Sequence, residues 1–540
     1  MADPQPAADP FGARFWFLVA SIPVVAVDVS VIDALLPDII KELGISVADA
    51  SLVDAITVTI AGALMVPAGK LGDLVGSKRV LVAGMAIAVI GGLLTGLANG
   101  VGLLMAGRVA QGVAFAMAVT MGLAILNREY PQGRERRRAF GIYVAAAICS
   151  LGFAPVVGAF LAEYASWRWA FLIVSPLAAV VAIGIQRTVS TAPKTTTKQS
   201  FDAFGSVLLV MAVGLFLFAI QQGSRYGWWH AAEGISFFGA PWRFALSPTP
   251  VLFVVAVLLL GAFLLVERWR THRQLDVVMD FRLFHIGSYI SGSLALALSS
   301  SASVGALLMV SLYAEYVMNA GPLVAGLIVM PLGFAVLVTG PIGERLARYP
   351  GRTTGLLGFA VQLAAVIVLV AASTRAGQPV VLAAAMFVLG VAWTLALSSL
   401  TSVILASVPA QLAGEAVGVQ TAARYLICGF AMVVMTTLMI SVAAFQGQKI
   451  GLAGLTPSDR TTIDAVERLT RPATSRPVAD AGSASQRAER ERFDQDLSKL
   501  RGDIDDGIRA AGLFTIFMLV LSLILVWRLP REAPTPAPSH

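Results

Sequence analysis

Charged residues are scarce in this sequence, and their scarcity excludes an ordinary soluble protein. Of its 540 residues only 13% are charged and 57% are hydrophobic, which gives a mean hydropathy of +0.79. Soluble domains carry about 25% charged residues. The chain is therefore expected to be an all-α integral membrane protein with many spans.

Residues that bind metals or perform covalent chemistry are also few. Cys149 and Cys428 are the only cysteines and both fall within apolar runs, so neither a disulfide framework nor a metal site is expected. The four histidines lie outside the cores of these runs, and no Ser/His/Asp cluster occurs. The phosphate-binding pattern Gly-x-x-x-x-Gly-Lys-Ser/Thr is absent as well. We expect no enzyme, no cofactor and no direct use of ATP.

Apolar runs long enough to cross a bilayer recur along the whole chain. A membrane-spanning helix needs about 20 mostly apolar residues. By length and hydropathy we expect fourteen spans, at residues 15–37, 50–67, 80–98, 102–126, 140–162, 169–186, 204–222, 251–266, 289–317, 323–341, 354–372, 380–405, 417–444 and 510–526.

The basic residues predict how these spans are oriented. With both termini in the cytoplasm, 21 Lys and Arg fall on inside segments and 5 in short outside loops. This asymmetry satisfies the positive-inside rule, so the pI of 9.6 reflects membrane orientation and no nucleic-acid partner is expected. Residues 1–14 lack the features of a cleaved signal peptide, and the first span is expected to direct insertion.

A polar joint between the second and third spans carries the most specific pattern in the chain. It reads Gly-x-Leu-x-Asp-x-x-Gly-x-Lys-Arg, with Gly69, Asp73, Gly76, Lys78 and Arg79 at the fixed positions. Its glycines allow a close reversal of the backbone, and its basic pair lies where cytoplasmic Lys and Arg collect. The order resembles the signature between helices 2 and 3 of the major facilitator superfamily; the alternative is an ordinary basic turn.

Further motifs narrow this resemblance to the fourteen-helix drug:proton antiporters of the superfamily. Asp28, near the end of the first span, matches an aspartate of the family pattern. Arg108 begins an Arg-x-x-Gln-Gly pattern in the fourth span. Gly152, Pro155 and Gly158 belong to a sequence close to the antiporter signature, in which alanines replace two of the usual glycines.

The resemblance implies a division of the chain into three parts. Residues 1–187 and 286–540 would form two six-helix bundles, and residues 188–285 would supply two additional spans with their linkers. A long outside loop at 445–509 would interrupt the second bundle. Its 11 acids and 11 bases cancel, so we expect a solvated loop, with partner docking as the alternative.

Charged residues in or beside the spans are the candidates for proton coupling and substrate binding. They are Asp28, Asp33, Asp54, Arg108, Glu315 and Arg424. Such a charge costs about 2.5–3.5 kcal/mol on the lenient insertion scale, so it faces water, a partner or a substrate path. Acids of the first span are expected near Arg108. Two alternatives stay open, a solvated Asp54 and a purely structural ion pair of Arg108.

The resemblance implies a secondary transporter in the bacterial inner membrane, working as a monomer. It would export a small lipophilic compound, cationic or neutral, in exchange for protons and so confer drug resistance. The proton gradient would supply the energy. One alternative is an exporter dedicated to one metabolite or lipid. A membrane subunit of a proton-translocating complex is another, but it would need lysines in the membrane, whereas every lysine here maps to a loop.

Asp73 is also expected to take part in the conformational change. In an outward-facing state the inner helix ends close together, which would bring Asp73 to the N-terminal end of a helix from the other half. Partial positive charge at such an end stabilises an anion. The contact would act as a latch that exists in one state only.

Overall fold

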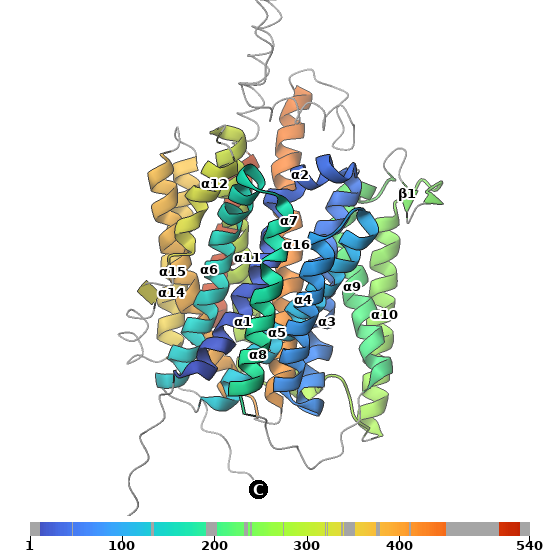
Figure 1. Cartoon of the computed structure of the whole chain (residues 1–540), viewed down its shortest axis with the longest axis vertical. Coiled ribbons are helices and arrows are strands. Elements are labelled where there is room, and N and C mark those ends of the chain that lie inside the picture. The colour runs from blue at the N-terminus through green and yellow to red at the C-terminus, as the bar shows by residue number, and fades with distance from the viewer. Residues whose placement is uncertain are drawn as a thin grey trace, which may run out of the picture.

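The computed structural model is a bundle of long helices that run roughly side by side (Figure 1). It describes residues 11–45, 47–130, 134–190, 202–231, 236–237, 240–273, 275–318, 320, 322–335, 338–339, 351–373, 378–409, 412–449 and 507–529. Within this part, 12 helices are long and apolar enough to cross a membrane, and residues 323–332 form a shorter apolar helix. The expected all-α membrane fold is confirmed.

The first part of the chain contributes eight helices. They are α1 (Ala13–Ser30), α2 (Ile32–Leu43), α3 (Val47–Val75), α4 (Ser77–Gly96), α5 (Val101–Glu129), α6 (Arg134–Tyr164), α7 (Trp167–Leu172) and α8 (Val174–Thr188). Among them α4 and α5, α3 and α5, and α1 and α6 are neighbours.

The remaining elements follow in chain order. They are α9 (Ala203–Tyr226), β1 (Ser236–Phe237), β2 (Ala240–Pro241), α10 (Pro248–His272), η1 (Phe281–His285), α11 (Gly287–Leu312), η2 (Tyr313–Val317), α12 (Pro322–Val329), η3 (Met330–Leu332), α14 (Gly351–Ser373), α15 (Pro379–Ala406), α16 (Ala413–Lys449) and a last helix at Gly507–Trp527. The two-residue strands form an antiparallel hairpin between α9 and α10.

The first span is not the single helix expected over residues 15–37. The helix ends at Ser30, and α2 begins at Ile32 and lies across one end of the bundle (Figure 1). The reason is the amphipathicity of α2. This helix buries one face through Ile32, Leu35 and Ile39 and exposes residues of its last turn, so it lies on the bundle and does not continue the span. Asp28 and Asp33 therefore lie on different helices.

The joint between the second and third spans is shorter than its polar sequence predicts. Helix α3 continues through Gly69 and Asp73 to Val75, and α4 begins at Ser77, so only Gly76 lies between them. Gly76 has φ +99°, a conformation that side chains rarely adopt. We call the end of the bundle at Gly76 the joint end, and the end at α2 the opposite end.

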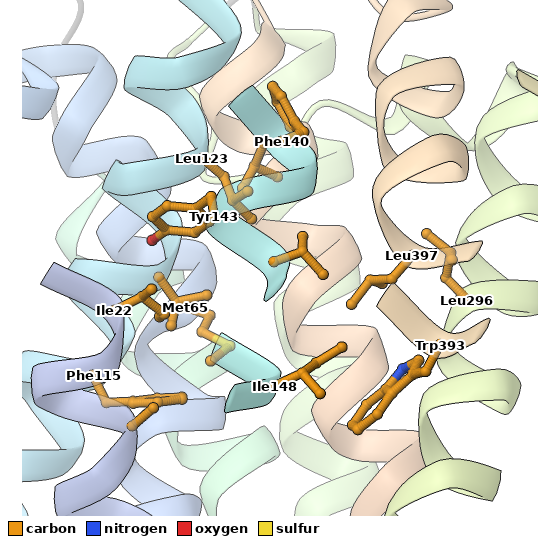
Figure 2. Packing of buried hydrophobic residues seen from close by; sticks show 14 of the residues in the cluster. Ile22, Met65, Phe115, Leu123, Phe140, Tyr143, Ile148, Leu296, Trp393 and Leu397 are labelled. Carbon is orange, nitrogen blue, oxygen red and sulfur yellow. The ribbon is translucent and has the colours of Figure 1, made fainter. Parts of the chain in front are cut away.

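The apolar core consists of a large cluster that spans both parts of the chain and a smaller one that includes Ile32, Leu35 and Ile39 of α2. Figure 2 shows part of it, where Ile22 and Met65 lie near Phe115, and Leu296 lies near Leu397. Helices from the two parts of the chain meet directly, because α3 packs on α16 and α6 packs on α12 and α15. The contact is close where Gly418 meets the backbone of Met65, since a Cβ at this glycine would lie 3.0 Å from the Met65 carbonyl oxygen.

Some predicted features lie outside the described residues. The side chains of Asp33 and Glu315 are among them, although their helices are described. Helix α16 continues to Lys449, beyond the expected boundary at residue 444, and residues 450–506 of the predicted loop lie outside the description.

Candidate transport site and helix joint

A buried polar network connects α1, α3 and α5 toward the opposite end. Arg108 of α5 is fully buried, and its Nη1 donates to Gln111 Oε1 at 2.9 Å and to the Asp28 carbonyl oxygen at 3.1 Å. Gln111 Nε2 in turn donates to Asp28 Oδ1 at 2.9 Å. Gln111 therefore bridges the arginine and the carboxylate. Asp28 lies near Arg108, where the acids of the first span were expected.

Helix α3 holds the same arginine from a second side. Arg108 Nε donates to the Val53 carbonyl oxygen at 3.3 Å, and Thr57 Oγ1 donates to the Arg108 carbonyl oxygen at 3.2 Å. Asp54, half-buried next to Val53, lies within electrostatic reach of the guanidinium. A Cβ at Gly112 would lie 2.6 Å from the Thr57 carbonyl oxygen, so a small residue is needed for α3 and α5 to approach this closely.

Gln111 is a member of this network to which the sequence assigned no role. The signal was present, because residues three apart on a helix share a face, and Gln111 is three residues after Arg108. The sequence could not show that its amide faces Asp28, which is 83 residues away.

Arg424 occupies a different place from Arg108. It lies on α16, with its guanidinium carbon 5.7 Å from the centre of the Tyr425 ring. Tyr425 meets Phe115 of α5 edge to face, with 5.7 Å between ring centres. The structure therefore does not gather all the candidate charges into one site.

The glycine and proline pattern of α6 forms a contact between the two parts of the chain. A Cβ at Gly152 would lie 2.4 Å from the backbone nitrogen of Gly333, and the rings of Phe153 and Phe334 are 5.0 Å apart. Helix α6 runs through Pro155, and Gly158 is buried. Gly152 therefore sets how closely α6 approaches the segment that follows η3.

At the joint end, Asp73 lies at the beginning of α16. The backbone N–H of Glu415, in the first turn of that helix, lies close to the Asp73 carboxylate. Lys78 is half-buried in the first turn of α4, and exposed Arg79 donates from Nη1 to the Val75 carbonyl oxygen at 3.4 Å. Asp73 thus lies beside the helix end that the predicted latch would use.

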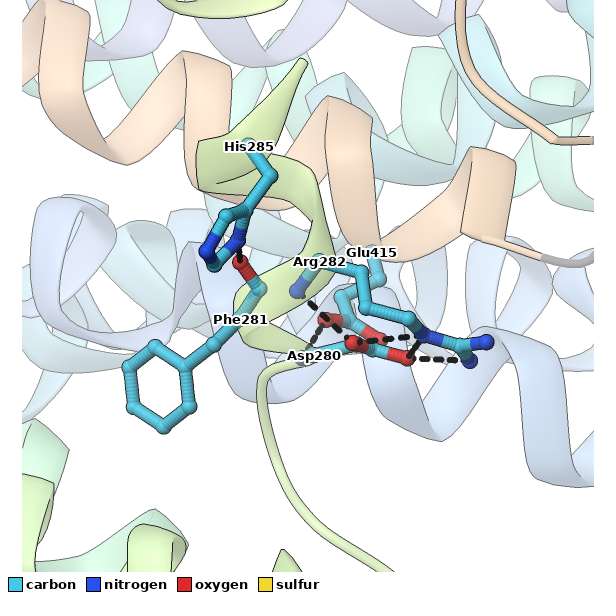
Figure 3. Close-up of polar contacts among 5 residues, drawn as sticks. All are labelled: Asp280, Phe281, Arg282, His285 and Glu415. Carbon is cyan, nitrogen blue, oxygen red and sulfur yellow. Dashed lines mark hydrogen bonds and ion pairs between the residues drawn. The ribbon is translucent and has the colours of Figure 1, made fainter.

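A second group of contacts at the joint end was not expected from the sequence. The N–H of Asp280 donates to the Glu415 side chain, and Arg282 binds the Asp280 carboxylate through Nε and Nη2 (Figure 3). The N–H of Val278 donates to Glu267 Oε1 at 2.9 Å. The segment from Asp276 to His285, which follows α10, is therefore tied to the beginning of α16.

Two carboxyl groups in this region have shifted pKa values. Burial raises the pKa of Glu415, which precedes the expected span, to about 7, although the Asp280 N–H and the Lys70 charge act against this. Burial alone would also raise the pKa of Asp280. Its hydrogen bonds and ion pair with Arg282 outweigh burial and hold that pKa below its ordinary value.

Long apolar helices, charges buried among them and close contacts between two groups of helices define a polytopic membrane transporter. The chain matches the model of the Major Facilitator Superfamily over residues 18–432, and it belongs to that family. Its members named below are transporters, so the chain is a transporter and not an enzyme.

Similar proteins agree with this family assignment. The chain is 25% identical to the multidrug resistance protein Stp of Mycobacterium tuberculosis, over 95% of this chain and 91% of that one. It is 26% identical to the methylenomycin A resistance protein of Streptomyces coelicolor, over 65% and 69% of the two chains. The structure of the proton:xylose symporter XylE superposes with a TM-score of 0.57 at 13% identity, covering 96% of this chain and 95% of that one.

Proposed function

We propose that this transporter exports a small lipophilic compound in exchange for protons by alternating access. The observation that carries the proposal is the buried Asp28 carboxylate, held by Gln111 beside Arg108 within the spans. We place the protein in a bacterial cell membrane as a monomer, with both termini and the joint end in the cytoplasm.

A buried carboxyl can couple proton movement to a conformational change. Burial in an apolar span disfavours its charged form, whereas a nearby guanidinium favours that form. If the inward and outward states differ in the water that reaches Asp28, proton binding shifts the balance between the two states. The network supports this role because Gln111 links the Arg108 guanidinium to the Asp28 carboxylate.

Export of a lipophilic compound is supported by the relatives named for resistance to drugs. The sequence favoured a cationic or neutral compound because acids outnumber arginines in the spans. In the structure Asp28 and Asp54 both lie near Arg108, so their negative charge is partly countered within the protein. The count of acids is therefore weak support for a cationic substrate.

Transport by purified protein in proteoliposomes tests the proposal. A pH gradient should drive uptake of at least one compound from a panel of lipophilic cations, neutral molecules and anions. Asp28→Asn should abolish gradient-driven transport and leave the protein folded, because it removes the charge and keeps the shape. Glu163→Gln changes an exposed acid at the end of α6 and serves as the matched control. Full gradient-driven transport by Asp28→Asn would exclude Asp28 as the coupling group.

A further inference from the structure

Arg424 lies where the two parts of the chain face each other. It belongs to a stretch of α16, residues 423–429, in which every residue is half-buried. Its electrostatic neighbours are Tyr143 of α6 and, on its own helix, Tyr425 and Cys428. The guanidinium therefore lies within electrostatic reach of two phenol groups and a thiol, one of the phenols on α6.

No carboxylate in the described part of the chain forms an ion pair with Arg424. Ser301 Oγ donates to Cys428 Sγ at 3.2 Å, which fixes α11 beside α16 at this level. Glu415 precedes Arg424 by nine residues on the same helix, or about 13 Å.

Among the described residues, Arg108 therefore lies near the acids Asp28 and Asp54, whereas Arg424 forms no ion pair with a carboxylate.

A guanidinium with no acidic partner among the described side chains is costly in a span and marks a functional position. Aromatic rings adjoin the guanidinium of Arg424. Tyr425 lies under it, and Phe115 packs against Tyr425. Tyr143 is held in place by donation to the Ala118 carbonyl oxygen at 3.3 Å. A cation next to apolar rings complements a molecule with an acidic head group and an aromatic or lipophilic body.

We propose that Arg424 binds the anionic group, a carboxylate, sulfonate or phosphate, of a lipophilic substrate whose body lies against Phe115 and Tyr425. An arginine suits this role because its planar donors bind such groups in pairs. That the bound molecule is also transported rests on the proposed function.

Binding of three matched probes tests the site without any proton gradient. Pyrenebutyrate, pyrenebutanol and pyrenebutyltrimethylammonium share one aromatic body and differ in charge. Their binding to the protein in lipid nanodiscs is measured by fluorescence, with empty nanodiscs subtracted. Wild-type protein should bind the anion most tightly. Equal or tighter binding of the cation would overturn the proposal even if no variant folds.

Substitutions of Arg424 test whether this residue provides the affinity for the anionic probe. Arg424→Gln should weaken pyrenebutyrate binding roughly tenfold to hundredfold, as expected when a charge-assisted hydrogen bond is lost, and leave pyrenebutanol binding unchanged. Arg424→Lys should retain part of the affinity because it keeps the charge. Arg273→Gln, at the end of α10, is the control for loss of a positive charge elsewhere.

The outcomes separate this site from the transport mechanism. Unchanged anion binding in Arg424→Gln, or an equal loss for all three probes, would overturn the anion site. Failure of gradient-driven transport with intact, Arg424-dependent anion binding would instead count against proton exchange and leave the site standing.

Discussion

At the scale of single residues, Gln111 links Arg108 to the Asp28 carboxylate. Its amide accepts from the arginine and donates to the carboxylate, at 2.9 Å in both cases. Gln111→Leu would keep the size of the side chain and remove both hydrogen bonds. Buried partners left without a hydrogen bond cost about 1–3 kcal/mol each. We expect a lower thermal midpoint in detergent and a severe loss of transport. A Leu variant with the thermal midpoint and the transport rate of wild type would show that the bridge is dispensable.

Glu415 is expected to make stability depend on pH. Its pKa is raised from 4.5 to about 7 in the folded protein, so folding favours its neutral form. This contribution is present below pH 4.5 and is lost as the pH rises through about 7. The charged or titratable groups that act on Glu415 or respond to it are Lys70, Asp73, Asp280, Arg282 and Tyr289.

The variant Glu415→Gln tests this pH dependence. Because glutamine does not titrate, the thermal midpoint of the variant should fall less than that of wild type between about pH 5 and about pH 8. Parallel curves for the two proteins across this range would assign the pH dependence to other groups.

At the scale of elements, the contact between α3 and α16 is the proposed latch. Asp73→Asn removes the charge that the first turn of α16 stabilises by about 0.3–1 kcal/mol. Exchange should slow, while substrate affinity measured in one locked state stays near the wild-type value. Distances between labels at the joint ends of α3 and α16 would report the populations. Identical distance populations in wild type and Asp73→Asn would contradict the latch. If Asp73→Asn is poorly expressed but the purified protein transports normally, the joint acts only as an insertion signal.

The approach of α6 to the segment after η3 gives a matched pair of glycine variants. A Cβ at Gly152 would lie 2.4 Å from a backbone atom of Gly333, whereas a Cβ at Gly141 of the same helix would meet nothing within 4 Å. Gly152→Ala should therefore push the two segments apart and reduce transport, and Gly141→Ala should not. Equal transport by the two variants would mean that this close contact is not needed in the transport cycle.

At the scale of the whole molecule, the additional helices α9 and α10 are connected to the proposed latch. Arg270 of α10 pairs with Asp202 at the beginning of α9, with 3.0 Å between Nε and Oδ2, and donates to the Asp276 carbonyl oxygen at 2.9 Å. The same segment then reaches Glu415 through Asp280. Removing residues 202–285 should therefore destabilise the closed joint end; label distances between α3 and α16 that match wild type after the deletion would contradict this.

Sequence patterns predicted the features that depend on local spacing. Hydropathy located most of the helices, and the motif around Asp73 predicted its contact with a helix N-terminus. The break after Ser30 was missed because apolar residues continue through it. The sequence does not show which surface α2 packs on, so its amphipathic face could not be distinguished from a continued span. The contact between Asp280 and Glu415 joins positions 135 residues apart, and neither residue belongs to a recognisable motif.

The bridge through Gln111 also leaves room for a proton on Asp28. Arginine can only donate, so the amide oxygen of Gln111 must face Arg108 and its NH₂ group must face Asp28. Asp28 Oδ1 is then an acceptor whether or not the carboxyl is protonated. A proton on Oδ2 leaves that bond in place, so Asp28 can gain or lose it without reversing any hydrogen bond in the chain that leads to Arg108.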